Sequence, residues 1–159
     1  MEDDKALRAH VLFLVGGGGA HLDFDAAVAE LPPNLRGNKP NGLLHSPWRL
    51  VEHMRIAQWD ILEFSRNSNH ESPPWPAGYW PEGDGPPDER AWDRSVKAFR
   101  ADLQAMQDLV ADDATDLLSP IPWGDGQTIL REALLVADHN AYHLGQLVTV
   151  RRMLGAWAD

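Results

Sequence analysis

Two histidines near the end of the chain, His139 and His143, have the type and spacing that most directly indicate chemistry. They lie four positions apart in a segment with a helical apolar period, so both rings belong to one helix face. A third histidine, His53, lies in a second such segment, residues 50–64. Three neutral imidazoles from two helices can bind a divalent ion such as zinc or nickel and leave one coordination position for a reactant. We therefore expect a mononuclear metal site at these three histidines.

The position of the pair within its segment supports this interpretation. Val136, His139, His143, Leu147 and Val150 form one helical stripe, which we expect to face the interior of the fold. Imidazole nitrogens in an apolar interior need polar partners. A shared metal ion satisfies both rings at once. The alternative is that each ring separately bonds to a backbone carbonyl or a carboxylate.

Four further histidines are weaker candidates. His10 lies near the apolar face of the first predicted helix and is either a core residue or a substitute ligand. His21 and His45 lie at junctions between loops and helices, and His70 lies in a polar loop where we expect it to be exposed.

Polar residues around the pair provide candidate orienting groups and exclude some chemistries. Asp138, Asn140, Tyr142 and Gln146 could orient the rings or make ordinary hydrogen bonds between helices. Asn140 stands where His-Glu-x-x-His zinc proteases have their general base, which argues against that route to peptide hydrolysis. The last helix has no Glu-x-x-His, so a di-iron site is disfavoured. The chain has no cysteine and hence no thiol nucleophile of its own.

Four long segments with helical periodicity must position these residues: 3–15, 47–66, 89–110 and 128–154. Ser46 and Pro47 are a favoured start for the second, and Asp23 could cap a short helix that reaches about residue 31. Residues 133–150 are apolar nearly all round, which predicts a deeply buried last helix. The pattern predicts an all-α fold, an antiparallel four-helix bundle with long crossover connections, in one domain over residues 1–159.

The connection over residues 67–88 is rich in proline and glycine and carries three large rings, Trp75, Tyr79 and Trp80. A structureless loop of this length is unusual in a compact domain, so we expect an ordered crossover against the helices. Its rings either pack on the bundle surface or belong to a mobile substrate lid.

Charge and composition restrict the partners. The formal net charge is −10, which disfavours nucleic acid and anionic membranes. Met1 is followed by three acidic residues rather than by the basic start of a secretory signal, and no apolar run is long enough to span a bilayer. We expect a cytoplasmic protein with no nucleic-acid and no membrane partner.

Residues 138–146 read Asp-His-Asn-Ala-Tyr-His-Leu-Gly-Gln, which closely resembles the last helix of the DinB-like superfamily of metal-binding four-helix bundles. The resemblance extends to the Ser-Pro-Trp opening at residues 46–48 with His53 after it, to the Trp/Pro-rich crossover, and to the Gly-Asp-Gly-Gln sequence at residues 124–127. It implies one divalent ion bound by one histidine of the second helix and two of the fourth, here His53, His139 and His143.

The resemblance implies several activities. Relatives include metal-dependent transferases that add bacillithiol, mycothiol or glutathione to electrophiles, and a thiol-dependent maleylpyruvate isomerase. We therefore expect a thiol S-transferase with a small-molecule thiol and an electrophile as partners, and a homodimer. A metal-dependent hydrolase and a non-catalytic, metal-stabilised stress-response module are the alternatives. Zinc, nickel, cobalt, copper and manganese are all candidates for the ion.

Overall fold

All regular secondary structure in residues 2–157, the range that the computed structural model of the chain describes, is helical. Within that range the only β-type pairing recorded is an isolated bridge between Pro120 and Thr128. The elements in chain order are α1 (Glu2–Gly16), α2 (Phe24–Val28), the 3-10 helix η1 (Pro33–Leu35), α3 (Pro47–Arg66), the 3-10 helix η2 (Ala77–Tyr79), α4 (Ala91–Ala111) and α5 (Ile129–Met153). The expected all-α fold is confirmed.

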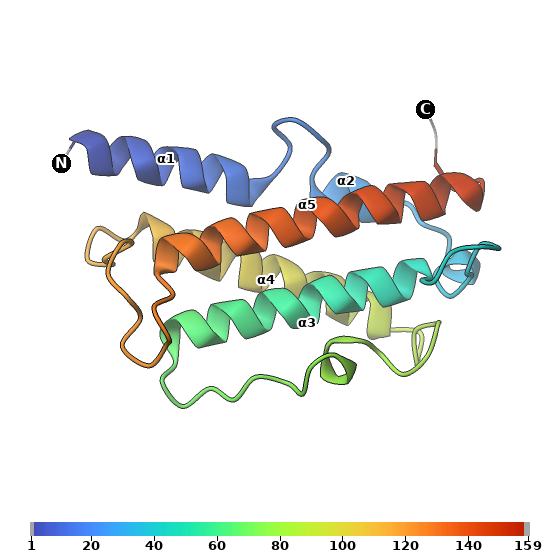
Figure 1. Ribbon diagram of the computed structural model, residues 1–159. Coiled ribbons are helices and arrows are strands. Elements are labelled where there is room, and N and C mark those ends of the chain that lie inside the picture. The colour runs from blue at the N-terminus through green and yellow to red at the C-terminus, as the bar shows by residue number, and fades with distance from the viewer. Residues whose placement is uncertain (1, 158–159) are drawn as a thin grey trace.

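The four long helices form a bundle in which α3 and α1 each pack against both α4 and α5. The 67–90 connection returns the chain along the length of α3 before α4 begins (Figure 1). As a result α3 and α4 run in the same direction, and α1 and α5 run in the opposite one. The crossover is thus present as expected, and it makes two of the packed helix pairs parallel rather than antiparallel.

Side-chain caps position the starts of three helices. Asp23, Ser46 and Thr128 each accept a hydrogen bond from the backbone N–H three residues further on. The helix capped by Asp23 ends three residues earlier than predicted, and Glu30 just beyond it has a left-handed φ of 54°. α4 begins at Ala91, two residues later than predicted.

The core consists of two apolar clusters that share α5 between them. One contains the second half of α5, with Leu144, Leu147 and Val150, and the stacked pair Phe24 and Phe99, whose ring centroids are 3.7 Å apart. The other contains the first half of α5, from Ile129 to Ala137 in sequence. The histidine pair lies on the part of α5 between the two clusters.

A buried polar pair lies on the same middle part of the bundle. Asn140 of α5 donates through Nδ2 to Oε1 of Gln58 on α3 at 2.9 Å. Gln58 in turn donates to the backbone carbonyl of Phe99 on α4 at 2.7 Å. These bonds join three helices at the level of the histidines. They satisfy the Gln58 amide, whereas the buried Oδ1 of Asn140 has no hydrogen-bond partner among the described residues.

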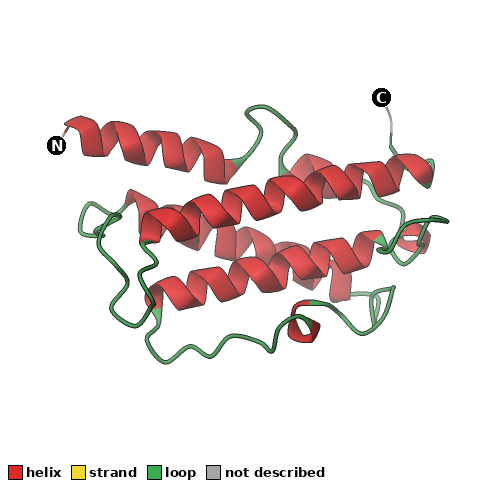
Figure 2. Cartoon of the chain, in the orientation of Figure 1, coloured by secondary structure: helices red, strands yellow, loops and turns green. Residues whose placement is uncertain are grey.

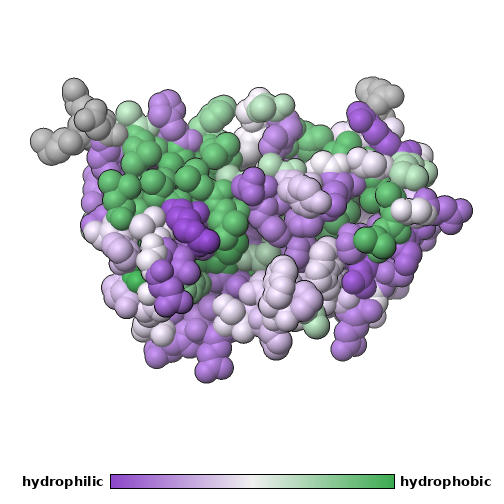
Figure 3. Space-filling view, in the orientation of Figure 1, coloured by the Kyte–Doolittle hydropathy of each residue, from purple (hydrophilic) through white to green (hydrophobic). Residues whose placement is uncertain are grey.

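The prediction of a deeply buried last helix is wrong for one face of α5. Leu134, Leu135 and Tyr142 on α5 are 41%, 36% and 65% exposed. Four long helices leave each helix one outward face, and on α5 that face carries these side chains among exposed polar ones such as Arg131 and Asp138. Figure 3 shows the resulting hydrophobic surface over α1 and the first half of α5. None of the described helices is long and apolar enough to span a membrane.

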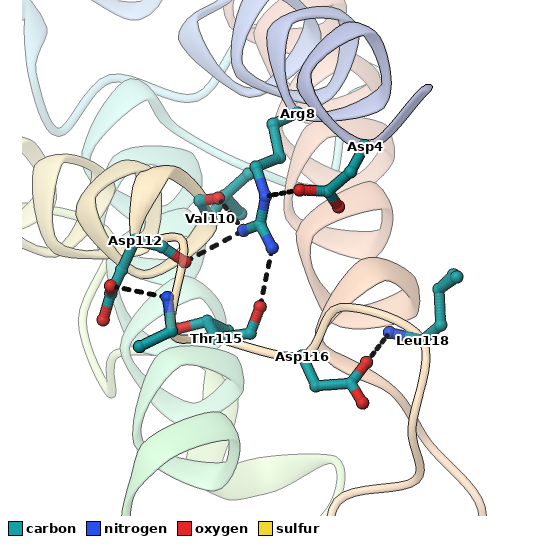
Figure 4. A network of polar contacts seen from close by, with 8 residues as sticks. Asp4, Arg8, Val110, Asp112, Thr115, Asp116 and Leu118 are labelled. Carbon is teal, nitrogen blue, oxygen red and sulfur yellow. Dashed lines mark hydrogen bonds and ion pairs between the residues drawn. The ribbon is translucent and has the colours of Figure 1, made fainter. Parts of the chain in front are cut away.

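A buried arginine ties α1 to the end of α4 (Figure 4). The Arg8 guanidinium donates to the backbone carbonyls of Val110, Asp112 and Thr115 at 2.6, 3.0 and 2.7 Å. Its Nε donates to Asp4 at 2.8 Å. Arg8 thus satisfies the Val110 carbonyl in the last turn of α4, which has no partner within the helix, and two carbonyls of the connection that follows.

Candidate metal site

The structure brings His53 of α3 together with His139 and His143 of α5. Nε2 of His53 lies 3.1 Å from Nε2 of His143 and 3.1 Å from Nε2 of His139. One nitrogen from each ring lies within 4.8 Å of the others. His53 and His143 are buried, and His139 is half-buried. The three rings therefore converge on one point, at the level of the buried Gln58–Asn140 pair.

Hydrogen bonds on the far side of two rings assign their tautomers. Nδ1 of His53 lies 2.8 Å from the carbonyl oxygen of Tyr79, and Nδ1 of His143 lies 2.7 Å from Oε1 of Gln146. Both partners are acceptors, so each Nδ1 carries the proton and donates it. Nε2 of each ring is left with a lone pair directed toward the other rings.

Burial keeps the three rings neutral. Desolvation lowers the pKa of His53 to about 4, against the opposing effect of its bond to the Tyr79 carbonyl. Desolvation and the neighbouring histidines lower the pKa of His139 to about 3. Burial also lowers the pKa of His143. Neutral imidazole is the form that binds a metal ion.

The donor set fits a divalent ion. Two unprotonated nitrogens 3.1 Å apart repel one another, whereas a cation between them is attracted to both. Zinc–nitrogen bonds of about 2.0–2.1 Å in a tetrahedral arrangement place two nitrogens about 3.3 Å apart, close to the spacing here. The cluster of described residues that could hold a metal ion consists of these three histidines alone, without a carboxylate.

The crossover runs beside α3, with the short helix η2 packed against it (Figure 2), and side-chain hydrogen bonds anchor it there. Buried Asp60 accepts from the Tyr79 hydroxyl at 2.6 Å and from Nε2 of His70 at 2.7 Å. These bonds hold the Tyr79 carbonyl against His53. The expectation that His70 is exposed is wrong, because its side chain is only 6% exposed where it meets the carboxylate.

Trp80 closes the site from the crossover side. Its ring stacks on His53 with centroids 3.8 Å apart and an interplanar angle of 1°. On its other face it stacks on His45 at 4.1 Å and 12°. Trp75, by contrast, is 78% exposed. The two tryptophans of the crossover thus differ in environment: Trp80 packs on the bundle, whereas Trp75 is exposed to solvent.

The remaining sequence candidates have different roles. Gln146 contacts the site as an orienting group for His143, whereas Asn140 makes the hydrogen bond between helices described above. Tyr142 has an edge contact with His143, with ring centroids 5.0 Å apart, and Asp138 is exposed. His10 and His21 are exposed as well, and neither belongs to the cluster.

Sequence reasoning missed two contributors, the Tyr79 carbonyl and Asp60. A backbone carbonyl has no residue type by which a sequence could reveal it. Asp60 was detectable, because it lies seven positions after His53 and so about two helical turns along the same face of α3. The sequence shows Trp80 only as one of three large rings in the crossover, with nothing that singles it out from Trp75.

A groove of about 500 Å³ lies beside the cluster, between α5 and residues 42–45. Its lining includes His45, Tyr142 and Gln146, each of which connects to the site through a contact described above. The three clustered histidines do not line it. The groove therefore adjoins the site rather than containing it.

Comparison with known proteins identifies the family. No curated protein and no solved structure matches the chain. The DinB superfamily matches residues 20–147, a range that includes all three clustered histidines and most of the bundle. The chain, with its all-helical fold and a three-histidine cluster compatible with metal binding, belongs to the DinB superfamily.

Proposed function

We propose that His53, His139 and His143 bind one divalent metal ion. The observation that carries this proposal is the convergence of their Nε2 atoms, two of them with assigned lone pairs 3.1 Å apart. Zinc, nickel, cobalt, copper and manganese are the candidates. A site of three imidazoles selects among them weakly, and availability decides which ion is taken up.

Elemental analysis of protein purified without added metal tests this site. We expect about one equivalent of one divalent metal in the wild type and a large loss in His53→Ala. His10→Ala, which removes an exposed histidine, is the matched control and should keep its metal. Equal metal content in all three proteins, or none in any of them after dialysis against zinc, would rule the site out.

We further propose that the protein is a metal-dependent transferase that joins a low-molecular-weight thiol to a small electrophile. Three protein ligands leave a coordination position for a reactant. The chain has no cysteine, so a sulfur nucleophile must come from a second substrate. The groove beside the cluster has a volume typical of small-molecule sites.

The residues support this reaction in distinct ways. A bound divalent ion would supply positive charge that lowers the pKa of a thiol at the site. Gln146 and the Tyr79 carbonyl orient the ligand rings, and Trp80 shields His53 from solvent. In the reaction the thiol loses its proton to solvent and its sulfur forms a bond to the electrophilic carbon. A halide leaves as this bond forms, or the oxygen of an opened epoxide or of a quinone receives the electron pair and takes up a proton from solvent.

An assay of metal-loaded protein with panels of thiols and electrophiles tests the activity. We expect thiol-dependent conversion by the wild type and by His10→Ala, and a loss of two or more orders of magnitude in His143→Ala. Wild-type rates in His143→Ala would refute the proposal. Conversion without added thiol, with water incorporated into the product, would instead identify a hydrolase. No conversion by metal-loaded protein would favour the non-catalytic stress-response module.

A further inference from the structure

The groove beside the metal site is lined by apolar and uncharged polar side chains. Leu43, Leu44, Leu50 and Val150 supply apolar surface, and no Asp, Glu, Lys or Arg is among the described residues that line it. Leu44 is 80% exposed at the edge of the groove, an apolar side chain that a bound molecule would cover. A charged ligand would lose hydration there without gaining an ionic partner. The lining therefore suits an uncharged and largely apolar molecule.

His45 does not add a charge to this lining. Burial and the nearby Arg49 lower the pKa of His45, so the ring is neutral at neutral pH. It stacks on Trp80, which in turn stacks on His53. These stacked rings connect one wall of the groove directly to the metal site.

Gln146 supplies one polar contact at the end of the groove next to the site. Its Oε1 accepts from Nδ1 of His143, so its NH₂ group points away from that ring on the other branch of the planar amide. Thr149, the neighbouring polar residue in the lining, donates its hydroxyl to the carbonyl of Gly145 at 2.9 Å. The Gln146 NH₂ group is thus a donor that a ligand at this end of the groove can use, in addition to the exposed Tyr142 hydroxyl in the same lining. The ligand should therefore carry a hydrogen-bond acceptor.

The absence of a side chain at Gly145 keeps the groove open. Gly145 is an exposed residue of α5 that lines the groove. A Cβ atom placed there would have no heavy atom within 4 Å. Its φ lies outside the left-handed region, so other residues can adopt this helical conformation. A larger side chain at this position would occupy the groove without disturbing the packing around it.

We infer that this groove binds the electrophile as a small, uncharged, largely apolar molecule with an oxygen acceptor that Gln146 holds beside the metal site. Epoxides, quinones and other carbonyl compounds belong to this class. The inference rests on the proposed function in naming the ligand as the electrophile rather than the thiol. Thiols such as glutathione carry carboxylates, which this lining does not match.

Binding of the neutral ketone dye prodan, whose emission shifts to the blue in apolar surroundings, tests the groove. We expect saturable binding to the wild type and to Gly145→Ala, and roughly tenfold or greater weakening in Gly145→Leu. Thr149→Phe blocks the same groove from an exposed position and should have the same effect if Gly145→Leu fails to fold. The anionic dye anilinonaphthalene sulfonate should bind much more weakly than prodan. Undiminished prodan binding by both blocking variants would overturn the inference.

Competition against prodan tests the role of Gln146. Acetylnaphthalene carries a carbonyl acceptor and ethylnaphthalene does not, so the wild type should prefer the ketone by about three- to tenfold. Gln146→Met should abolish the preference while still binding both compounds. An unchanged preference for the ketone would show that Gln146 does not donate a hydrogen bond to the ligand.

The inference and the proposed function can fail separately. Prodan binding does not require the histidines, so it should persist in His139→Ala. If no thiol transfer is found but Gly145→Leu still excludes prodan, the groove assignment stands without the reaction. If Gly145→Leu transfers thiols with the wild-type kcat/KM for every electrophile, the reaction stands and the groove assignment fails.

Discussion

At the scale of single residues, the site depends on pairs in which one group orients another. His53 presents its Nε2 because the Tyr79 carbonyl takes the proton on Nδ1, and His143 does so because Gln146 accepts from it. Partners of this kind raise metal affinity by fixing the ring and its tautomer. The properties of the site should therefore respond to residues that never touch the ion.

Tyr79→Phe tests this dependence. The substitution removes the hydroxyl that donates to Asp60 at 2.6 Å and so loosens the segment that carries the Tyr79 carbonyl. We expect zinc affinity, measured by competition with a chromophoric chelator, to fall by about tenfold. Glu82→Gln changes an exposed side chain of the same crossover and should leave the affinity unchanged. Equal affinities for the two variants would show that the hydrogen bond between Tyr79 and Asp60 does not affect metal binding by His53.

The histidine pKa values predict how the metal-free protein responds to pH. Burial holds the pKa of His53 near 4 and that of His139 near 3, below the value of about 6.5 in an unfolded chain. Between pH 6.5 and pH 4 the unfolded state therefore binds more protons than the folded state. Stability present above pH 6.5 is lost as the pH falls through this window.

Thermal unfolding in the presence of a chelator measures this effect. The Tm of the wild type should fall as the pH decreases from 7 toward 4.5, and His139→Leu should flatten the dependence. His10→Leu, at an exposed position, should leave it as steep as in the wild type. Zinc affinity should decline over the same range, because protons compete for the ring nitrogens. A Tm that does not vary with pH would contradict the assignment of neutral, buried rings.

At the scale of elements, long-range polar contacts hold helices whose connections leave them far apart in sequence. Arg8 binds carbonyls at the end of α4 more than a hundred residues away. The Gln58–Asn140 bond joins α3 to α5 at the level of the histidines. Such contacts set the relative height of the helices, which apolar packing alone determines less sharply.

Arg8→Met measures the first of these contacts. It leaves the carbonyls of Val110, Asp112 and Thr115 without their charged donor. We expect the free energy of unfolding to fall by about 2–4 kcal/mol, and the Tm by about 5–10 °C. Arg100→Met breaks an exposed ion pair with Asp25 and should cost less than about 1 kcal/mol. A similar Tm for both variants would show that the buried guanidinium contributes no more than a surface pair.

At the scale of the whole molecule, α1 and α5 expose apolar side chains that no other described element of the chain covers. Leu14 on α1 and Leu134 and Leu135 on α5 are 51%, 41% and 36% exposed. Figure 3 shows a hydrophobic area over α1 and the first half of α5. Contiguous apolar surface of this kind marks interaction sites. A second copy of the chain presents the same apolar surface and would cover it in a symmetric dimer.

A mass measurement in solution tests the dimer. We expect twice the chain mass of 17.7 kDa for the wild type at micromolar concentration and a monomer for Leu134→Glu. Leu118→Glu changes another exposed leucine, 65% exposed in the 112–128 connection, and should remain dimeric. A monomeric wild type would end the proposal without affecting the metal site.

The sequence by itself determined what depends on near neighbours in the chain. The caps at Ser46 and Thr128 are local interactions, and so is the one-turn spacing that places His139 and His143 on the same face of α5. Apolar periodicity predicted the long helices for the same reason, although it could not show that α5 keeps an exposed face. An apolar side chain has the same type whether or not another element covers it.

Only the tertiary structure decided how those faces meet. The approach of His53 to the pair on α5 depends on the relative height and rotation of two helices, which long-range packing sets. The Tyr79 carbonyl belongs to the backbone, and any residue type at that position could have supplied it. The groove exists because residues 42–45 pass beside Gly145 at a distance set by the whole bundle. These features arise from contacts between residues far apart in the chain, and no local pattern encodes them.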